Sequence, residues 1–183
     1  MRIVGGTLGG RVLKAPSGQS TRPTSEKVRE AIFNILPDVE GTHVLDLFAG
    51  SGGLGIEALS RGAVHATFVD FDKGALKALR TNLAELALED RATVIATDAI
   101  AAARRAPPAP WRFVFVDPPY ASDLAVRSVL ALPAASLTAD AQIVIEHDRR
   151  HAPPDTLGSM LRTDQRRYGD TLVSFYGFSE VPP

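Results

Sequence analysis

Four consecutive residues, Asp117-Pro118-Pro119-Tyr120, follow an apolar run and have the chemistry to bind an amino group. The carboxylate of Asp117 and the carbonyl of Pro118 are hydrogen-bond acceptors, and Pro118 has no backbone N–H to compete with them. Pro119 restricts the backbone so that both acceptors can converge on one nitrogen, and the Tyr120 ring offers a face on which a base can stack. These residue types predict a site for the exocyclic amine of a nucleobase, unless the prolines only end a strand and Tyr120 only packs.

The chemistry open to such a site is transfer of a group directly to nitrogen. Two acceptors that take both hydrogens of an amine localise its lone pair, and holding that nitrogen in line with a methyl donor lowers the entropic part of the barrier without a strong base. The chain contains no cysteine, which excludes a thiolate nucleophile, thiolate zinc sites and iron–sulfur clusters. Its four histidines lack the spacing of metal ligands, so no metal is expected.

A second candidate site is the run DLFAGSGGLGIEAL at residues 46–59, which carries glycines in the order G-x-G-x-x-G between an apolar run and a helix-forming stretch. Such glycines permit a tight turn and let backbone amides approach a ligand, but the pattern alone does not separate a dinucleotide from S-adenosylmethionine. The first acid of the run, Asp46, would repel a pyrophosphate and attract the ammonium of a methionine-like group. We therefore expect S-adenosylmethionine to contact Asp46, Phe48, Ala49, Gly50, Ser51 and Gly52.

Two further acids stand at the ends of later strand-like runs. Asp70 lies twenty residues after Gly50, the spacing at which an acid accepts hydrogen bonds from both ribose hydroxyls in this architecture. The adjacent Phe71 could cover an adenine ring. Asp98, with Ala99 beside it, could accept a hydrogen bond from the adenine amine. Each acid could instead cap a helix or be an ordinary surface charge.

The elements that must position these residues alternate between strand and helix patterns after Gly41. Strand patterns cover His43–Phe48, His65–Asp70, Ala92–Ala96, Arg112–Val116 and Ala141–Glu146, and helix patterns cover Leu54–Arg61, Lys73–Leu86, Ala99–Arg104 and Leu124–Leu132. This alternation predicts an α/β fold whose mostly parallel sheet has helices on both faces. Two last strand patterns, Met160–Tyr168 and Thr171–Phe178, flank Gly169-Asp170, which predicts an antiparallel hairpin at one edge.

The front of the chain has a different character. Residues 1–20 are rich in glycine and predict a small hairpin or an irregular arm. From Ser25 to Leu36 the apolar residues follow the stripe of an amphipathic helix, with Thr24 or Ser25 as its cap and Pro37 as its end. We therefore divide the chain into an N-terminal arm and helix, residues 1–37, and a main domain, residues 38–183.

Basic side chains are concentrated at this front, where residues 1–37 hold six of them against two acids. Such a segment can be a solvated extension or a docking surface. The overall composition is that of a soluble globular protein, with 45% hydrophobic and 22% charged residues among 183. No apolar run approaches the roughly 20 residues of a membrane span, and MRIVGGTLGG lacks the apolar core of a secretory signal, so a cytoplasmic location is expected.

Several motifs occur together in a recognisable order: TRPTSEKVREAIFNIL, DLFAGSGGLGIEALSRGA, FVDFDKGA, TDA and FVDPPY. Over nearly its whole length the chain resembles the RsmD-type bacterial methyltransferases, which modify the 2-amino group of a guanine in 16S ribosomal RNA. The resemblance implies a Rossmann-like class I fold and guanine 966 as the target. It also implies that Asp46, Gly50, Asp70 and Asp98 contact S-adenosylmethionine and that Asp117 to Tyr120 hold the guanine. Family members often have Glu at the position of Asp70.

The resemblance also implies a partner, which is small-subunit ribosomal RNA, bound by a monomer and presented on a partly assembled ribosomal particle. The front charges then become candidate phosphate contacts, namely Arg11, Lys14, Arg22, Lys27 and Arg29, and Arg149, Arg150, Arg166 and Arg167 could extend this surface. Three alternatives remain open on the same pocket: methylation of adenine-N6 in DNA, methylation of a glutamine amide, and a non-catalytic RNA-binding chaperone with this fold.

Overall fold

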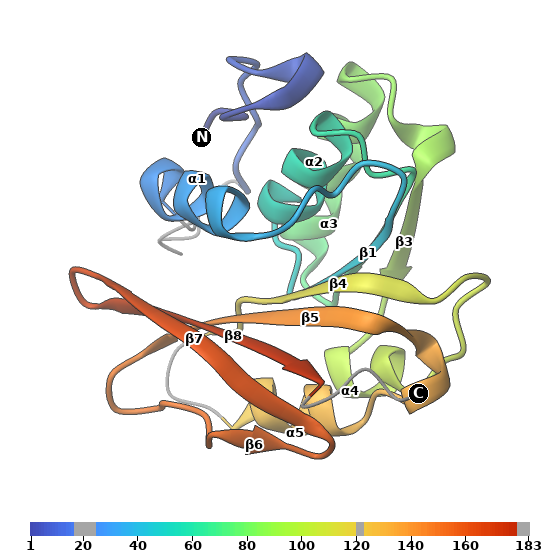
Figure 1. The fold of residues 1–183 in the computed structure, drawn as a ribbon. Helices are drawn as coiled ribbons and strands as arrows, with labels where there is room; N and C mark the ends of the chain where they lie inside the picture. The colour runs from blue at the N-terminus through green and yellow to red at the C-terminus, as the bar shows by residue number, and fades with distance from the viewer. Residues whose placement is uncertain (17–24, 120–122, 179–183) are drawn as a thin grey trace.

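The computed structural model describes residues 1–16, 25–119 and 123–178 and is built on one eight-stranded sheet (Figure 1). The strand order is β3-β2-β1-β4-β5-β8-β7-β6. Strands β1 to β5 run parallel to one another, and β8, β7 and β6 continue the sheet in antiparallel fashion. The prediction of a mostly parallel sheet with an antiparallel edge hairpin is confirmed.

The strands are β1 (His43–Leu47), β2 (His65–Asp70), β3 (Ala92–Ala96), β4 (Trp111–Val116), β5 (Leu137–Asp148), β6 (Thr156–Leu157), β7 (Met160–Tyr168) and β8 (Thr171–Phe178). The helices are α1 (Glu26–Ile35), α2 (Gly53–Ser60), α3 (Lys73–Glu85), α4 (Ala99–Ala103) and α5 (Leu124–Leu130), with short 3-10 turns at Gly6–Leu8, Glu89–Arg91 and Ala134–Ser136. The predicted elements therefore exist, and apart from the start of β5 their ends agree with the prediction or differ from it by one or two residues.

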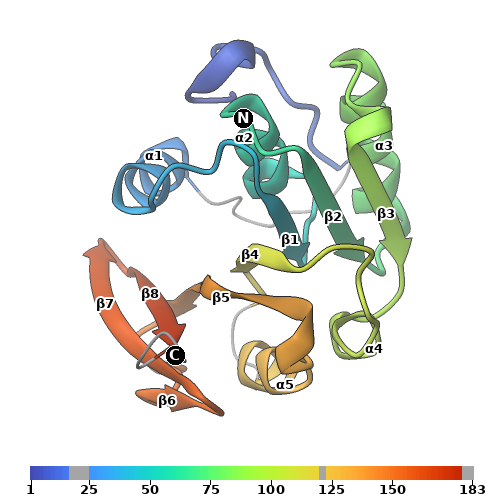
Figure 2. The same cartoon turned by 45° about the vertical axis from the view of Figure 1, so that its right-hand side comes forward.

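Two helical layers cover the two faces of the sheet (Figure 2). Helices α1, α2 and α3 bury their apolar residues in one hydrophobic cluster with Val44, Phe68 and Phe115, whereas α4 and α5 pack in a second cluster with Leu47 and Val116. The central strands are buried on both sides, which explains why they read as continuous apolar runs rather than as alternating ones.

Helix α1 is the amphipathic helix predicted from the stripe. The Ser25 hydroxyl accepts a hydrogen bond from the Val28 N–H at 3.2 Å and so caps its first turn. The Phe33 ring packs against that of Phe115 in β4, with 5.5 Å between the ring centroids. The helix ends at Ile35 because Pro37 disfavours a helical backbone at Leu36, which is extended.

The first residues of the chain form the irregular arm that was predicted, closed by a bridge between Arg2 and Val12. Ile3 and Leu13 are buried in the cluster beneath α1, α2 and α3, so the arm shares the core of the sheet. The backbone N–H groups of Val4 and Gly5 donate to the Glu57 carboxylate of α2, at 2.7 and 2.8 Å. The domain boundary at residue 37 stays a prediction.

One predicted RNA contact is wrong. Arg29 is fully buried on α1, where its Nε lies 3.3 Å from a carboxylate oxygen of Glu57, and it also donates to the carbonyl of Arg2. A guanidinium enclosed in this way cannot reach an RNA phosphate. Glu57, which is also fully buried, needs positive partners at that place, and Arg61 supplies the second at 2.8 Å.

The last part of the sheet differs from the predicted bounds at two points. Strand β5 starts at Leu137 rather than Ala141, because Leu137 pairs with Trp111 before an irregularity shifts the register to Gln142 and Phe113. The two-residue strand β6 was not predicted, since so short a segment has no periodicity and is defined only by its pairing with β7. The hairpin turn at Gly169-Asp170 is confirmed, with Tyr168 opposite Thr171.

Candidate functional site

The two motifs that could do chemistry leave the sheet at one edge, side by side. β1 and β4 are parallel neighbours, and Leu47, the last residue of β1, pairs with Val116, the last residue of β4. The glycine turn therefore begins beside Asp117, because each follows directly after one of these paired strand ends. The chain continues from β1 toward β2 and β3 on one side and from β4 toward β5 on the other, so this place is the topological switch point where ligands of such sheets bind.

The three glycines of the turn serve different purposes. Gly50 has a φ of 55°, and a Cβ added there would meet nothing within 4 Å, so the space over it is open to a ligand. Gly52 has a φ of 92°, and a Cβ there would lie 2.6 Å from the Leu79 side chain. A Cβ on Gly55 would lie 2.3 Å from the Phe68 ring, so this glycine lets α2 pack closely on β2.

Backbone strain marks the start of the turn. Phe48 has a φ of 66°, which is unusual for a residue with a side chain, and such strain of about 1–3 kcal/mol clusters at functional sites. Two backbone hydrogen bonds hold Ala49 in place: its N–H donates to Val69 at 2.9 Å, and its carbonyl accepts from Gly52 at 2.7 Å. The turn is therefore rigid before any ligand binds.

A buried amide supports the turn from behind. The Asn82 side chain donates to the carbonyl of Ser51 and to that of Lys14, each at 3.0 Å, and accepts from the Lys14 N–H at 2.8 Å. Asn82 thus joins the glycine turn, α3 and the N-terminal arm. The only sequence signal for it is a polar residue within the apolar stripe of α3, where Leu79 and Leu83 are its buried neighbours.

Asp70 closes the turn on the side of β2. One of its carboxylate oxygens accepts from the Gly50 N–H at 2.8 Å, and the other accepts from the Asp72 N–H at 2.8 Å. Each oxygen has further acceptor capacity, which suits two vicinal hydroxyl groups. The Phe71 side chain next to it is 66% exposed, so an apolar ring stands uncovered at the same edge. Asp70 is thus hydrogen-bonded to the glycine turn, with Phe71 next to it in the chain, and the contacts of both residues with a cofactor stay predictions.

Asp46 is buried at the end of β1, where its carboxylate accepts one hydrogen bond from the Gly55 N–H at 2.8 Å. Burial raises the pKa of Asp46 to about 8, against the opposing effect of this hydrogen bond, and the charges of Asp117 and Asp70 raise it further. The mutual influence of Asp46, Asp117 and Asp70 places the three acids in one electrostatic environment. A ligand cation placed there would relieve their repulsion.

The other residues predicted for the cofactor and amine sites lie at the same edge. Asp98 is exposed and caps α4 by accepting from the Ala101 N–H at 2.9 Å, with Ala99 buried next to it. The capping alternative is thus realised through one carboxylate oxygen, and the other has no hydrogen-bond partner among the described residues. Asp117 and Pro118 are half-buried and Pro119 is exposed directly after β4. Tyr120 lies outside the described residues.

The basic residues at the front of the chain differ in how far they are engaged by other parts of the protein. Lys14 forms an ion pair with Glu85, and Arg11 donates to the carbonyl of Glu85 at 3.2 Å, so both exposed side chains are held against α3. Lys27 is exposed near the start of α1. Arg22 lies outside the described residues. This surface is thus less available to a phosphate than its charge count suggests.

Two features are absent within the ranges that the structure describes. No group of three or more histidine, aspartate or glutamate side chains there could hold a metal ion. Of the helices in those ranges, none has the length and apolar character needed to cross a membrane.

Comparisons with known proteins agree on one family. The family model described as Conserved hypothetical protein 95 matches residues 1–177. "Putative rRNA methyltransferase YlbH" of Bacillus subtilis is 45% identical over 183 residues, covering 96% of this chain and 98% of that protein. "Ribosomal RNA small subunit methyltransferase D" of Escherichia coli K12 is 38% identical over 156 residues, covering 84% and 78%.

Solved structures give the same result. The structure of yhhF from Escherichia coli superimposes with a TM-score of 0.85 at 31% identity and covers 98% of both chains. The ribosomal protein L11 methylase of Lactobacillus delbrueckii, at 17% identity and a TM-score of 0.69 over 82% of this chain, shares the fold. The chain therefore belongs to the RsmD methyltransferase family, the family described as Conserved hypothetical protein 95.

Proposed function

We propose that this protein is an S-adenosylmethionine-dependent methyltransferase that modifies the exocyclic 2-amino group of a guanine in small-subunit ribosomal RNA. The observation that carries the proposal is the shared edge of the sheet, where the glycine turn after β1 and Asp117 after β4 lie on adjacent parallel strands. A methyl donor over the turn and an amine at Asp117 would then be neighbours. The names of the relatives, which refer to ribosomal RNA, support the substrate class.

The residues of the turn fit the proposed cofactor. Asp46 would attract the ammonium group of the cofactor, and Asp70 would accept hydrogen bonds from its ribose hydroxyls. The open space over Gly50 would let the cofactor lie directly against the backbone of the turn. Phe71 would cover the adenine, and Asp98 would accept a hydrogen bond from the adenine amine. When bound, S-adenosylmethionine supplies a methyl group on a positively charged sulfur, which is activated without help from the protein.

The amine site prepares the nitrogen. The Asp117 carboxylate and the Pro118 carbonyl would accept the two hydrogens of the guanine amine, which keeps its lone pair directed at the methyl group. Methyl transfer would form the new N–C bond, release the cofactor as neutral S-adenosylhomocysteine and make the nitrogen acidic. The Asp117 carboxylate would then receive the proton that leaves.

The RNA partner is proposed from charge as well as from the relatives. Of the predicted phosphate contacts, Arg11, Lys14 and Lys27 are exposed and remain proposals, as does Arg22, whereas the buried Arg29 is excluded. We propose that a monomer acts on RNA in a partly assembled small subunit, as the family resemblance implies.

Methyl transfer tests the function directly. Purified protein would be incubated with labelled S-adenosylmethionine and with ribosomal RNA, or small-subunit particles, from cells that lack the enzyme. The modified nucleoside would then be identified by mass spectrometry. We expect N2-methylguanosine; N6-methyladenosine or a methylated protein would replace the proposal by one of the alternatives, and no incorporation into any small-subunit substrate would favour the chaperone.

Asp117→Ala separates the amine site from the cofactor site. We expect turnover to fall by roughly two to three orders of magnitude because one of two positioned acceptors is removed. Cofactor affinity, measured by calorimetry, should stay within a few-fold, since Asp117 only adds to the raised pKa of Asp46. Asp117→Asn keeps one acceptor oxygen and should be intermediate in turnover. An equal loss of turnover and cofactor affinity would instead assign Asp117 to the fold or to the cofactor.

A further inference from the structure

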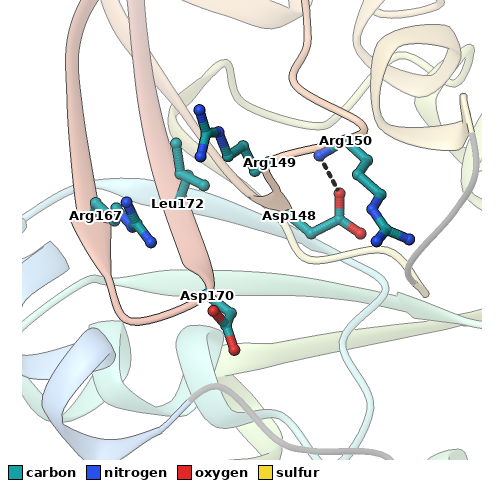
Figure 3. A pocket seen from close by; sticks show the side chains of 6 residues that line it. All are labelled: Asp148, Arg149, Arg150, Arg167, Asp170 and Leu172. Atoms are coloured by element: carbon teal, nitrogen blue, oxygen red, sulfur yellow. Dashed lines mark hydrogen bonds between the residues drawn. The ribbon is translucent and has the colours of Figure 1, made fainter.

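A recess lies at the same edge of the sheet, at the carboxyl end of β5 (Figure 3). It has a volume of about 360 Å³, which is within the usual range of small ligand sites. Asp148 at the end of β5 pairs with Thr171 at the start of β8, so the turn between β7 and β8 forms the other wall. The lining residues are Asp148, Arg149, Arg150, Arg167, Asp170 and Leu172.

Three arginines from two separate segments line this recess. Arg149 and Arg150 are exposed, and neither guanidinium forms an ion pair or hydrogen bond with a described residue. Arg167 uses its Nε to donate to the Gly169 carbonyl at 2.8 Å, which leaves its terminal nitrogens for another acceptor. Arg149 and Arg167 extend toward each other over Leu172 (Figure 3).

Within the described residues, the two acids of the recess form no ion pair with these three arginines, which exceed them by one charge. Asp148 accepts from the backbone N–H groups of Arg150 and His151, at 2.8 and 2.9 Å, and pairs with the His151 ring, so its carboxylate shapes the turn that carries the arginines. The carboxylate of Asp170 points away from Arg149 and Arg167 (Figure 3). The recess therefore presents positive charge around a small apolar floor, Leu172.

The recess adjoins the amine site. β4 and β5 are parallel neighbours, and Val116 pairs with Ile145, so Asp148 lies only a little farther along its strand than Asp117. Asp117 stands level with Glu146, two residues before Asp148, so the usual strand spacing and rise put their backbones about 8 Å apart. That separation is close to the distance between a base and the phosphates that flank it.

We infer that this recess binds the sugar–phosphate backbone of the RNA strand beside the target guanine. Planar guanidinium groups pair well with phosphate oxygens, and Leu172 gives a ribose an apolar surface. Such a grip would hold the backbone while the base leaves its stack to reach Asp117, a step that costs a few kcal/mol in a duplex and less in a loop. The inference rests on the proposed function, which places the base at Asp117.

The test uses the full-length protein and a fluorescently labelled RNA hairpin with a guanine in its loop. Fluorescence anisotropy measures the Kd of the protein for this hairpin at a series of potassium chloride concentrations. We expect Arg149→Gln/Arg150→Gln to weaken binding about tenfold at low salt. The slope of log Kd against log salt should fall by roughly 0.7 for each phosphate of a single strand that the variant no longer neutralises. The KM for RNA in methyl transfer should rise in parallel with Kd.

A matched control exists in Arg104→Gln/Arg105→Gln. These are also adjacent exposed arginines, and the same charge is removed, but they follow α4 in the connection that leads back to the start of β4. We expect the Kd of this control variant for the hairpin to stay within about twofold of that of the unmodified protein. Thermal melting of both variants checks that neither change affects folding.

The outcomes separate the inference from the proposed function. If the unmodified protein methylates guanine but Arg149→Gln/Arg150→Gln binds the hairpin with unchanged Kd and salt slope, the inference is overturned and the function stands. A defect seen only on ribosomal particles, with normal hairpin binding, would also overturn it, because the recess would then contact a protein. If no RNA is methylated but the salt slope still falls, the backbone site stands and the function fails.

Discussion

Several charged groups around the N-terminal arm are paired within the protein, whereas several at the carboxyl edge of the sheet form no ion pair with a described residue. Glu57 is fully buried between two arginines and two backbone amides. Asp46 is also buried, but its carboxylate accepts a hydrogen bond from one backbone amide, and its charged neighbours are two other acids, Asp70 and Asp117. A buried ionisable group that has counter-charges within the protein supports the fold, and one that has none points to a ligand.

The same contrast applies to the exposed cations. Lys14 pairs with Glu85, and Arg11 donates to its carbonyl, so the front arginines and lysines are partly engaged. Arg149 and Arg150 have no such partner among the described residues. The number of basic residues in a segment therefore does not identify a nucleic-acid surface, because the internal partners of each residue decide what remains for a phosphate.

The largest effect is expected for the matched pair at the front. Arg29→Met should lower the free energy of unfolding by about 3–5 kcal/mol, because the Glu57 carboxylate stays buried after losing one of its two cations. Urea denaturation measures the loss. Lys27→Met, an exposed change on the same helix, should cost less than about 0.5 kcal/mol. If the two variants lost the same free energy of unfolding, the buried ion pair of Arg29 would not stabilise the fold more than an exposed charge does.

A smaller effect is expected for the unmatched acid at the edge. Because the pKa of Asp46 is about 8, its carboxyl is mostly protonated and neutral at pH 7. It must therefore lose this proton before it can form an ion pair with a bound ammonium group. The affinity for S-adenosylhomocysteine, which carries the same amino group, should therefore rise roughly tenfold between pH 7 and pH 8.5. Asp46→Asn should bind more weakly and without this rise. A flat profile for the unmodified protein would show that Asp46 does not face the ligand cation.

The same residue should affect stability in the opposite direction. Its pKa is raised in the folded state, so its contribution is fully present below about pH 4 and is lost as the pH rises to about 8. Urea denaturation of the ligand-free protein across that range should show a steeper decline for the unmodified protein than for Asp46→Asn.

The smallest effect is expected for the engaged cations of the arm. Arg11→Gln/Lys14→Gln should change the salt slope of RNA binding by less than the roughly 0.7 expected for one phosphate contact, because both side chains are held against α3. Anisotropy with the same RNA hairpin measures the slope. If the salt slope decreased as much as in the Arg149 and Arg150 double variant, the arm would bind RNA as strongly as the recess does. The contrast between paired and unpaired cations would then be wrong.

Local patterns in the sequence predicted most elements of the fold. The helix at α1, the parallel strands and the Gly169-Asp170 hairpin follow from periodicity, caps and turn residues, which act over a few neighbours. The early start of β5 and the existence of β6 were missed, because both depend on pairing with a distant strand. Arg29 was assigned to RNA for a similar reason: its partner, Glu57, is 28 residues away.

By itself, the sequence determined which chemical groups the protein carries and in what local setting: a glycine turn after a strand, an acid after each of several strands, and two prolines beside Asp117. Only the tertiary structure decided that β1 and β4 are neighbours, that Asp46 and Asp117 influence each other, and that three arginines line one recess near them. Strand order and burial join residues far apart in the chain, and no local pattern of residues specifies them.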